Sequence, residues 1–173
     1  MTNLESASAM PVEEKVNTVK TAASYIQVVC FKLEDEEYAF NILNIKEVIH
    51  ISRITFVPQM PTFVLGVINI RGTIVPVFDL KKKFVLQDKE FTSDTRIVVT
   101  ILNNGMVGLV VDKVLENLMI EKGSIDPVPT VKMQIDKECI LGIGKLSGRM
   151  ITILDIENVH RTVLNDIKAN TGT

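Results

Sequence analysis

One stretch constrains the fold more than any other: residues 66–80 read G-V-I-N-I-R-G-T-I-V-P-V-F-D-L. Apolar, mostly β-branched residues stand on both sides of Arg71-Gly72, which is the pattern of two strands joined by a tight turn. Gly72 can adopt the positive φ that such a turn requires. The stretch therefore predicts an apolar hairpin that holds Arg71 at its tip.

The same pattern occurs again near the other end of the chain. Residues 142–156 read G-I-G-K-L-S-G-R-M-I-T-I-L-D-I and align with residues 66–80 without a gap. Each copy begins with a glycine, carries a glycine at its turn and has an aspartate near its end. The matched pairs are Gly66 with Gly142, Gly72 with Gly148, and Asp79 with Asp155. Self-similarity of this kind indicates an internally duplicated architecture.

Each half of the chain presents the same order of patterns: a hairpin, an interrupted apolar strand, a proline-containing loop and a second hairpin. The second half opens with an Asn-Gly turn at Asn103-Asn104-Gly105, between two apolar runs, which is a strong hairpin signal. About five short strands in roughly 55 residues is a spacing typical of small barrels. We therefore expect a mainly β (all-β) protein with two small five-stranded β-barrel subdomains.

The folded domain is expected to span residues 25–163. One subdomain should cover about 25–80 and the other about 95–155. Residues 1–24 are polar and mixed in charge, with only a weak stripe of three valines, so they predict a flexible tail. We expect the fold to begin near Tyr25.

Two further segments lie outside the predicted hairpins. Lys81–Asp94 is charged and without pattern, which predicts a solvated linker between the halves. After Asp155 the apolar residues recur every three or four positions, so residues 156–173 are expected to form a C-terminal helix and tail. The residues of this helical stripe are Ile156, Val159, Val163, Leu164 and Ile167.

Composition argues against several classes of function. The net charge of −2 and the pI near 5.7 speak against general nucleic-acid binding, which usually needs a basic balance. No secretory signal pattern is present, and no apolar run reaches the roughly 18–20 residues of a membrane helix. Cys30 and Cys139 stand alone in apolar surroundings, which predicts reduced structural thiols. We expect a cytosolic protein.

A catalytic, metal or cofactor site is not predicted. His50 and His160 have no metal-ligand spacing to Cys, Asp or Glu. The glycines of residues 142–148 match no phosphate-binding motif and suit a hairpin turn better. Asp79 and Asp155 suggest an acid–base pair, but equivalent aspartates in a duplication more simply cap a turn or helix. A small β-barrel hydrolase or ligand carrier remains the alternative function.

The remaining chemistry is surface for binding. Two small barrels that pack together leave a seam, and Ile45 and Val114 on the interrupted strands are candidates to line it. Apolar side chains in such a groove commonly hold an amphipathic helix. Alternatively, the same side chains close the core between the halves, and the residues favour neither reading.

Seven segments point to one family. In the first half they are residues 35–38, 45–48, 66–72 and 74–80, reading D-E-E-Y, I-K-E-V, G-V-I-N-I-R-G and I-V-P-V-F-D-L. In the second half they are 107–112, 141–144 and 149–155. From about Tyr25 to Val163 the chain resembles the CheW family of chemotaxis coupling proteins. The most specific part is the Asn-x-Arg-Gly turn with I-V-P-V-x-D-L after it, although Ile70 replaces the usual leucine.

The resemblance implies two interlocked five-stranded barrels with a hydrophobic groove between them, and an adaptor without catalytic activity. The implied partners are the cytoplasmic tip of chemoreceptors, a helical hairpin, and the regulatory domain of the histidine kinase CheA, which has the same fold. It also implies a cytoplasmic protein that its partners recruit to membrane receptor arrays. The chain lacks kinase phosphate-binding motifs and an acidic receiver segment, so it is not expected to be a piece of CheA or a CheW–receiver fusion.

Particular positions carry over from this resemblance. Those that match positions implicated in receptor or array contact are Ile45, Glu47, Arg71, Ile97, Val114 and Asn117. Asn117 departs from the aliphatic residue familiar at its position. Gly66 and Gly72 match positions that serve either the kinase contact or only the backbone.

Overall fold

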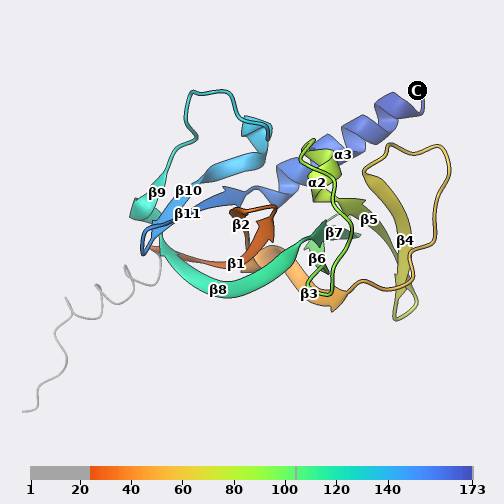
Figure 1. The fold of residues 1–173 in the computed structure, drawn as a ribbon, viewed down its shortest axis with the longest axis horizontal. Coiled ribbons are helices and arrows are strands. Elements are labelled where there is room, and N and C mark those ends of the chain that lie inside the picture. The colour runs from red at the N-terminus through yellow and green to blue at the C-terminus, as the bar shows by residue number, and fades with distance from the viewer. Residues whose placement is uncertain (1–23, 104, 173) are drawn as a thin grey trace, which may run out of the picture.

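The computed structural model describes residues 24–103 and 105–172, which form two curved sheets and a long C-terminal helix (Figure 1). The expected tail at 1–24 lies outside the described residues except for Ser24. The prediction of a mainly β protein is confirmed, and so is the C-terminal helix, α3 (Ile156–Asn170). None of the helices in the described part is long and apolar enough to span a membrane.

The strands divide between a six-stranded and a five-stranded sheet. The six-stranded sheet has the order β8 (Lys113–Glu121), β1 (Tyr25–Leu33), β2 (Glu36–Asn41), β11 (Arg149–Leu154), β10 (Ile140–Leu146) and β9 (Ile125–Asp126). The five-stranded sheet has the order β3 (Ile45–His50), β6 (Arg96–Leu102), β7 (Gly105–Val111), β5 (Thr73–Asp79) and β4 (Val64–Ile70). Short helical turns are η1 (Ile42–Asn44), α2 (Leu80–Lys83), η2 (Lys122–Ser124) and η3 (Lys137–Cys139).

The two sheets exchange strands between the sequence halves. The first hairpin, β1–β2, lies in the sheet that holds β8 to β11, while β6–β7 lies in the sheet that holds β3 to β5. The exchange is symmetric, because β2 pairs in parallel with β11 and β7 pairs in parallel with β5. The expected subdomain ranges 25–80 and 95–155 therefore do not separate the sheets. The six-stranded sheet also exceeds the expected five strands through β9, a strand of two residues.

This exchange follows from strands that are apolar on both faces. In β6, Ile97 and Val99 face a core enclosed by the five-stranded sheet, whereas Val98 faces a core between the two sheets. In β2, Ala39 likewise faces a core enclosed by the six-stranded sheet, and Phe40 faces the core between the sheets. Strands buried on both faces read as continuous apolar runs, and each hairpin needs cover from both sides.

The core between the sheets, here called the inter-sheet core, contains every buried aromatic side chain of the described residues. These are Phe31, Tyr38, Phe40, Phe63, Phe78 and Phe84. Helix α3 closes this core with its own apolar stripe, including Ile156, Val159 and Val163. The inter-sheet core therefore joins the two sheets and α3 into one body.

The aspartate predictions are confirmed, because each aspartate caps the helix that follows its hairpin. Asp79 Oδ1 accepts hydrogen bonds from the amides of Lys81 and Lys82 at the start of α2. Asp155 Oδ1 accepts from the amides of the second and third residues of α3. Such caps satisfy amides that have no partner inside the helix.

The prediction of a solvated linker is wrong at Lys81. Its side chain is only 2% exposed, and its Nζ lies 2.6 Å from Asp112 Oδ1. A buried ammonium needs a charged partner, and Asp112 supplies it from the connection between β7 and β8. The other oxygen of Asp112 accepts the amide of Glu34 at 2.7 Å. Sequence pattern missed this contact because its partners are far apart in the chain.

Candidate functional site

The tip of the β4–β5 hairpin carries the most distinctive exposed group among the predicted positions. Arg71 has φ +47° and Gly72 φ +86°, so both turn residues are left-handed, as in the tightest hairpin turns. Asn69 Oδ1 accepts the Gly72 amide at 2.8 Å and closes the turn. The Asn-x-Arg-Gly segment therefore presents an arginine on a rigid support.

Arg71 makes a bidentate ion pair with Glu47 of β3. Its two terminal nitrogens donate to the two carboxylate oxygens at 3.1 and 3.0 Å. The arginine side chain remains 74% exposed, whereas the glutamate side chain is 22% exposed. An exposed pair contributes little to stability, but it holds the guanidinium in one orientation at the surface.

Ile45 and Val114 occupy equivalent places in the two copies. Each lies at the start of its strand, beside an irregularity of strand pairing: Ile45 is opposite Thr100, and Val114 is opposite Phe31. Both are half-buried and pack against the inter-sheet core. The structure therefore supports the reading in which they close the core, while part of each side chain stays at the surface.

The two remaining predicted contact residues differ in exposure. Asn117 is exposed on β8, opposite Val29 of β1. Ile97 has no exposed surface and lies inside the five-stranded sheet. A direct partner contact through the Ile97 side chain is therefore not supported, because a partner cannot reach it without opening the sheet. The sequence could not show this, since both faces of β6 are apolar.

Gly66 is required by the backbone. Its φ is +142°, and a Cβ placed on it would lie 2.0 Å from the carbonyl oxygen of Thr55. The amide and carbonyl of Thr55 bond to Val67 at this point. Gly142 has the same role in the other copy, where a Cβ would lie 2.7 Å from the carbonyl oxygen of Asp126. A Cβ placed on Gly72 would have no neighbour within 4 Å among the residues that the structure describes, so its positive φ is what favours glycine there.

Sequence reasoning missed an arginine on the second hairpin. Arg149 of β11 donates to Glu37 of β2 at 2.7 Å and to Glu116 of β8 at 2.6 Å. Its side chain is 31% exposed, so it is more enclosed than Arg71. Glu116 of β8 pairs with an arginine as Glu47 of β3 does. Aligning β3 with β8 in the sequence could have pointed to the ion pair between Arg149 and Glu116.

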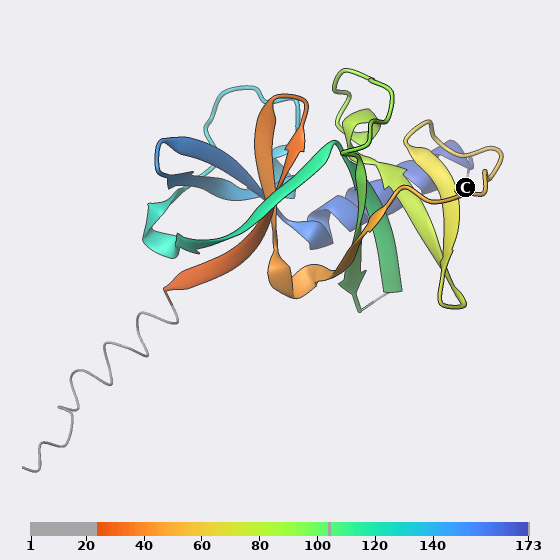
Figure 2. The same ribbon diagram turned by 60° about the horizontal axis from the view of Figure 1, so that its bottom comes forward.

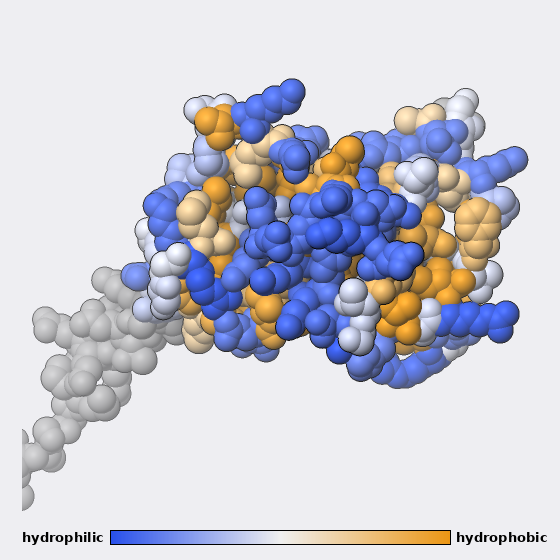
Figure 3. Space-filling model, viewed as in Figure 1, coloured by the Kyte–Doolittle hydropathy of each residue, from blue (hydrophilic) through white to orange (hydrophobic). Residues whose placement is uncertain are grey.

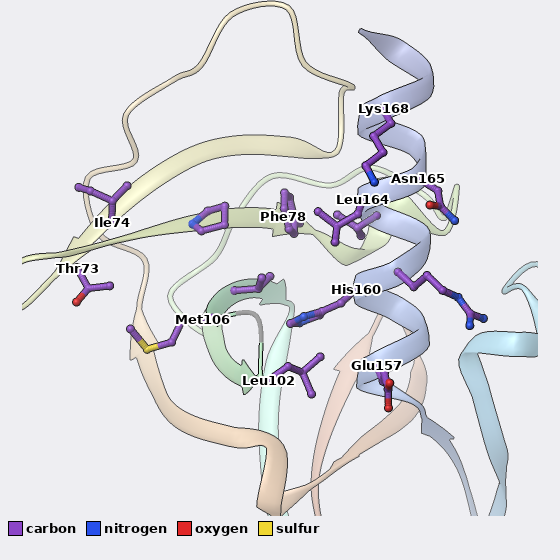
Figure 4. Close-up of a pocket in the computed structure, with 15 residues that line it drawn as sticks. Thr73, Ile74, Phe78, Leu102, Met106, Glu157, His160, Leu164, Asn165 and Lys168 are labelled. Atoms are coloured by element: carbon purple, nitrogen blue, oxygen red, sulfur yellow. The ribbon is translucent and has the colours of Figure 1, made fainter. Parts of the chain in front are cut away.

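One groove of the structure lies away from the expected seam. A cavity of about 620 Å³ lies between α3 and the outer face of β5 and β7, and neither Ile45 nor Val114 lines it (Figure 4). Figures 1 and 2 place α3 on the opposite side of the molecule from β3 and β8. On the face shown in Figure 3, hydrophilic residues gather over the middle and hydrophobic residues over the five-stranded sheet.

The buried titratable groups act within the fold. His160 Nε2 lies 2.9 Å from Thr100 Oγ1, and burial lowers the pKa of His160 to about 4. Burial raises the pKa of the Cys30 thiol to about 11, and both cysteines are buried and unpaired. Within the described residues no group of three or more His, Cys, Asp or Glu side chains could hold a metal ion.

Comparison with known proteins agrees with this geometry. The family model described as the CheW-like domain matches residues 27–163. The chain belongs to the CheW family. It is 38% identical over 134 residues to the chemotaxis protein CheW of Helicobacter pylori, covering 78% of this chain and 81% of that protein.

Two further CheW-like relatives support the assignment. The CheW protein of Thermotoga maritima is 35% identical over 144 residues, covering 83% of this chain and 93% of that protein. The crystal structure of the scaffolding protein TtCheW from Thermoanaerobacter tengcongensis matches with a TM-score of 0.72 and 37% identity. That match covers 76% of this chain and 89% of the other. The CheW fold therefore accounts for the whole body except the ends of the chain.

Proposed function

We propose that this protein is a non-catalytic adaptor that couples the cytoplasmic tips of chemoreceptors to a CheA-type histidine kinase. One observation supports placing the partner contact at the surface around Arg71: its side chain is held by Glu47 at 3.0 Å and is still 74% exposed. The family membership supports the scaffold role, and the name of the Thermoanaerobacter relative describes a scaffolding protein.

The contact would use a fixed charge beside apolar surface. Arg71 is held at a tight turn, so it loses little conformational freedom when a partner binds. Glu47 occupies one side of the guanidinium, and within the described residues the remaining donors are left for a carboxylate or carbonyl of a partner. Ile45 and Val114 would add half-buried apolar surface, and Asn117 would add a polar group on β8. The kinase regulatory domain or the receptor hairpin would meet this surface.

The alternative of a hydrolase or ligand carrier has no support from the two aspartates. Asp79 and Asp155 both use Oδ1 to cap a helix. Asp79 is 1% exposed, so it offers no surface to a substrate.

We propose that the protein works in the cytoplasm and reaches receptor arrays through its partners.

The experiment is a charge reversal at Arg71 with a control at the equivalent place on the second hairpin. We expect Arg71→Glu to weaken binding by about 1–3 kcal/mol, as for an interface anchor, and to leave the unfolding midpoint within experimental error. Ser147→Glu should leave binding unchanged. Purified variants would be titrated by calorimetry with a receptor cytoplasmic fragment and, separately, with a CheA regulatory domain. Wild-type protein that binds neither partner would refute the adaptor role.

A further inference from the structure

A second surface lies on the side away from β3 and β8. The cavity between α3 and the five-stranded sheet, here called the α3 groove, is lined by apolar side chains from both walls (Figure 4). The apolar lining residues are Ile74, Pro76, Phe78, Leu102, Met106, Val107, Val163 and Leu164. Nothing in the proposed receptor or kinase contact uses this groove.

Each wall of the α3 groove carries one apolar side chain that is open to solvent. Ile74 of β5 is 61% exposed, and Leu164 of α3 is 47% exposed. At the floor, His160 is bonded to Thr100 through Nε2, so this ring nitrogen is already paired. An apolar partner could therefore cover the floor without leaving that group unpaired.

The groove is elongated along the helix. Its lining residues on α3 run from Glu157 to Lys168, at positions 157, 160–161, 163–165 and 168, which recur about once per helical turn. Eleven steps of 1.5 Å along a helix correspond to about 16 Å, or three turns. A segment of this length matches a helix of a partner with an i, i+3, i+4, i+7 apolar stripe.

The charges at the two ends of the groove are opposite. Glu157 stands at the α3 N-terminal end and Lys168 near the C-terminal end, and both line the groove. Arg161, between them, is already paired with Glu138 at 2.8 Å. No side chain of residues 24–103 or 105–172 makes an ion pair with Lys168. Lys168 is thus available to an acidic group of an occupant.

We propose that the α3 groove docks an amphipathic helix of a partner protein, antiparallel to α3, with an acidic residue beside Lys168 and a basic residue beside Glu157. Acidic residues are favoured in the first turn of a helix and basic residues in its last turn. An antiparallel helix brings its first turn next to the last turn of α3, so the charges of the two helices match. The docking surface is separate from the Arg71 surface and goes beyond the proposed adaptor contact.

The duplicated chain supplies a matched control for testing the groove. Ile74 aligns with Met150 of the second hairpin, and the two are 61% and 64% exposed. Only Ile74 lines the α3 groove. A glutamate at either position faces solvent to the same extent, so the two variants differ in the groove and not in exposure.

The probe is a synthetic amidated peptide of about 16 residues, long enough to form a helix when bound. It carries leucines at i, i+3, i+4 and i+7, glutamate in its first turn and lysine in its last. Binding of the full chain is followed by fluorescence anisotropy. We expect Ile74→Glu and Leu164→Glu to weaken binding about tenfold or more, and Met150→Glu to change it less than about twofold.

Orientation is tested by a charge exchange. Lys168→Glu should weaken binding of this peptide about threefold, and a peptide with lysine in its first turn should recover the loss. Failure of the wild-type chain to bind the peptide would overturn the proposal, as would an equal loss with Met150→Glu or no recovery on charge exchange. Sedimentation is measured alongside: dimers that Ile74→Glu abolishes would make a second copy the occupant and would also overturn it. Circular dichroism checks that each variant is folded. If Ile74→Glu does not fold, Leu164→Glu tests the groove in its place.

Discussion

The β4–β5 and β10–β11 hairpins are two copies of one design that differ at their tips. Both turns have two left-handed residues, Arg71-Gly72 in one copy and Ser147-Gly148 in the other. The first tip carries an exposed arginine that reaches the glutamate of β3. The second carries a serine, and its arginine stands two residues later in a more enclosed network. The left-handed turn that the two copies share forms the hairpin, whereas the residue at the tip, Arg71 or Ser147, gives each copy a different surface.

The segments after the two hairpins differ in the same instructive way. The first hairpin leads into α2, a helix of four residues, and the second into α3, a helix of fifteen. Each helix places a polar group in the protein interior: Lys81 pairs with Asp112, and His160 bonds to Thr100. One copy thus uses a buried ion pair and the other a neutral hydrogen bond. Four predictions test how far this comparison extends.

The largest effect is expected from breaking the ion pair behind the first hairpin. Asp112→Ala leaves the Lys81 ammonium buried without a counter-charge, which should lower the free energy of unfolding by about 3–5 kcal/mol. Urea denaturation measures it. Asp126→Ala removes the exposed partner of Lys145 and should cost under about 1 kcal/mol. Equal losses in the two variants would contradict the buried-pair account.

The glycine before each hairpin gives the next effect. Gly66→Ala forces a Cβ onto the Thr55 carbonyl at a positive φ, and we expect a loss of about 2–4 kcal/mol. Gly142→Ala should cost less, because its closest backbone contact is longer and its φ is not in the left-handed range. Gly123→Ala, with open space around it, is the control. If Gly66→Ala lost partner binding while keeping full stability, the glycine would have a direct contact role.

The buried histidine behind the second hairpin should make the stability depend on pH, because burial lowers its pKa. The pKa of His160 is about 4 in the folded chain and about 6.5 when unfolded, so the unfolded chain binds more protons between these values. Stability should therefore fall by about 3 kcal/mol as the pH drops from 7 to 4. His160→Gln should lack this component. Chemical denaturation at several pH values gives the unfolding free energy of each protein, and the difference between the two slopes against pH measures the contribution of His160. Parallel slopes for both proteins would show that His160 does not titrate as stated.

The smallest effect concerns the second oxygen of each capping aspartate. Asp155 Oδ2 accepts from Asn158 Nδ2 at 3.1 Å, whereas Asp79 Oδ2 is buried without a hydrogen-bond partner among the described residues. Lys82 stands where the second copy has Asn158. We expect Lys82→Asn to stabilise the fold by about 0.5–1.5 kcal/mol by supplying the missing donor.

The reverse substitution completes that test. Asn158→Lys should leave Asp155 Oδ2 unpaired and destabilise the fold by a similar amount. Thermal unfolding at neutral pH measures both changes. Shifts of the same sign in the two variants would mean that the aspartate oxygens are not responsible.

Much of the local structure could be predicted from the residues alone. The Arg71-Gly72 turn, the duplicated hairpins, the aspartate caps and the helix after Asp155 all depend on neighbours within a few positions. Short-range interactions of this kind leave a period or a turn signal in the sequence. The same holds for the match between the hairpin glycines, since both must let another backbone approach.

Only the tertiary structure decided how the hairpins combine. Strands that are apolar on both faces fit either sheet, so the pattern could not assign β1–β2 and β6–β7 to opposite halves. The family resemblance, not the pattern, gave Ile97 as a contact position, and a strand that is apolar on both faces could not show that the Ile97 side chain is completely buried. Lys81 was expected in solvent because its counter-ion, Asp112, lies more than thirty residues away. Contacts between distant segments set these outcomes. The α3 groove is one more of them, since its walls come from β5, the end of β6, β7 and α3.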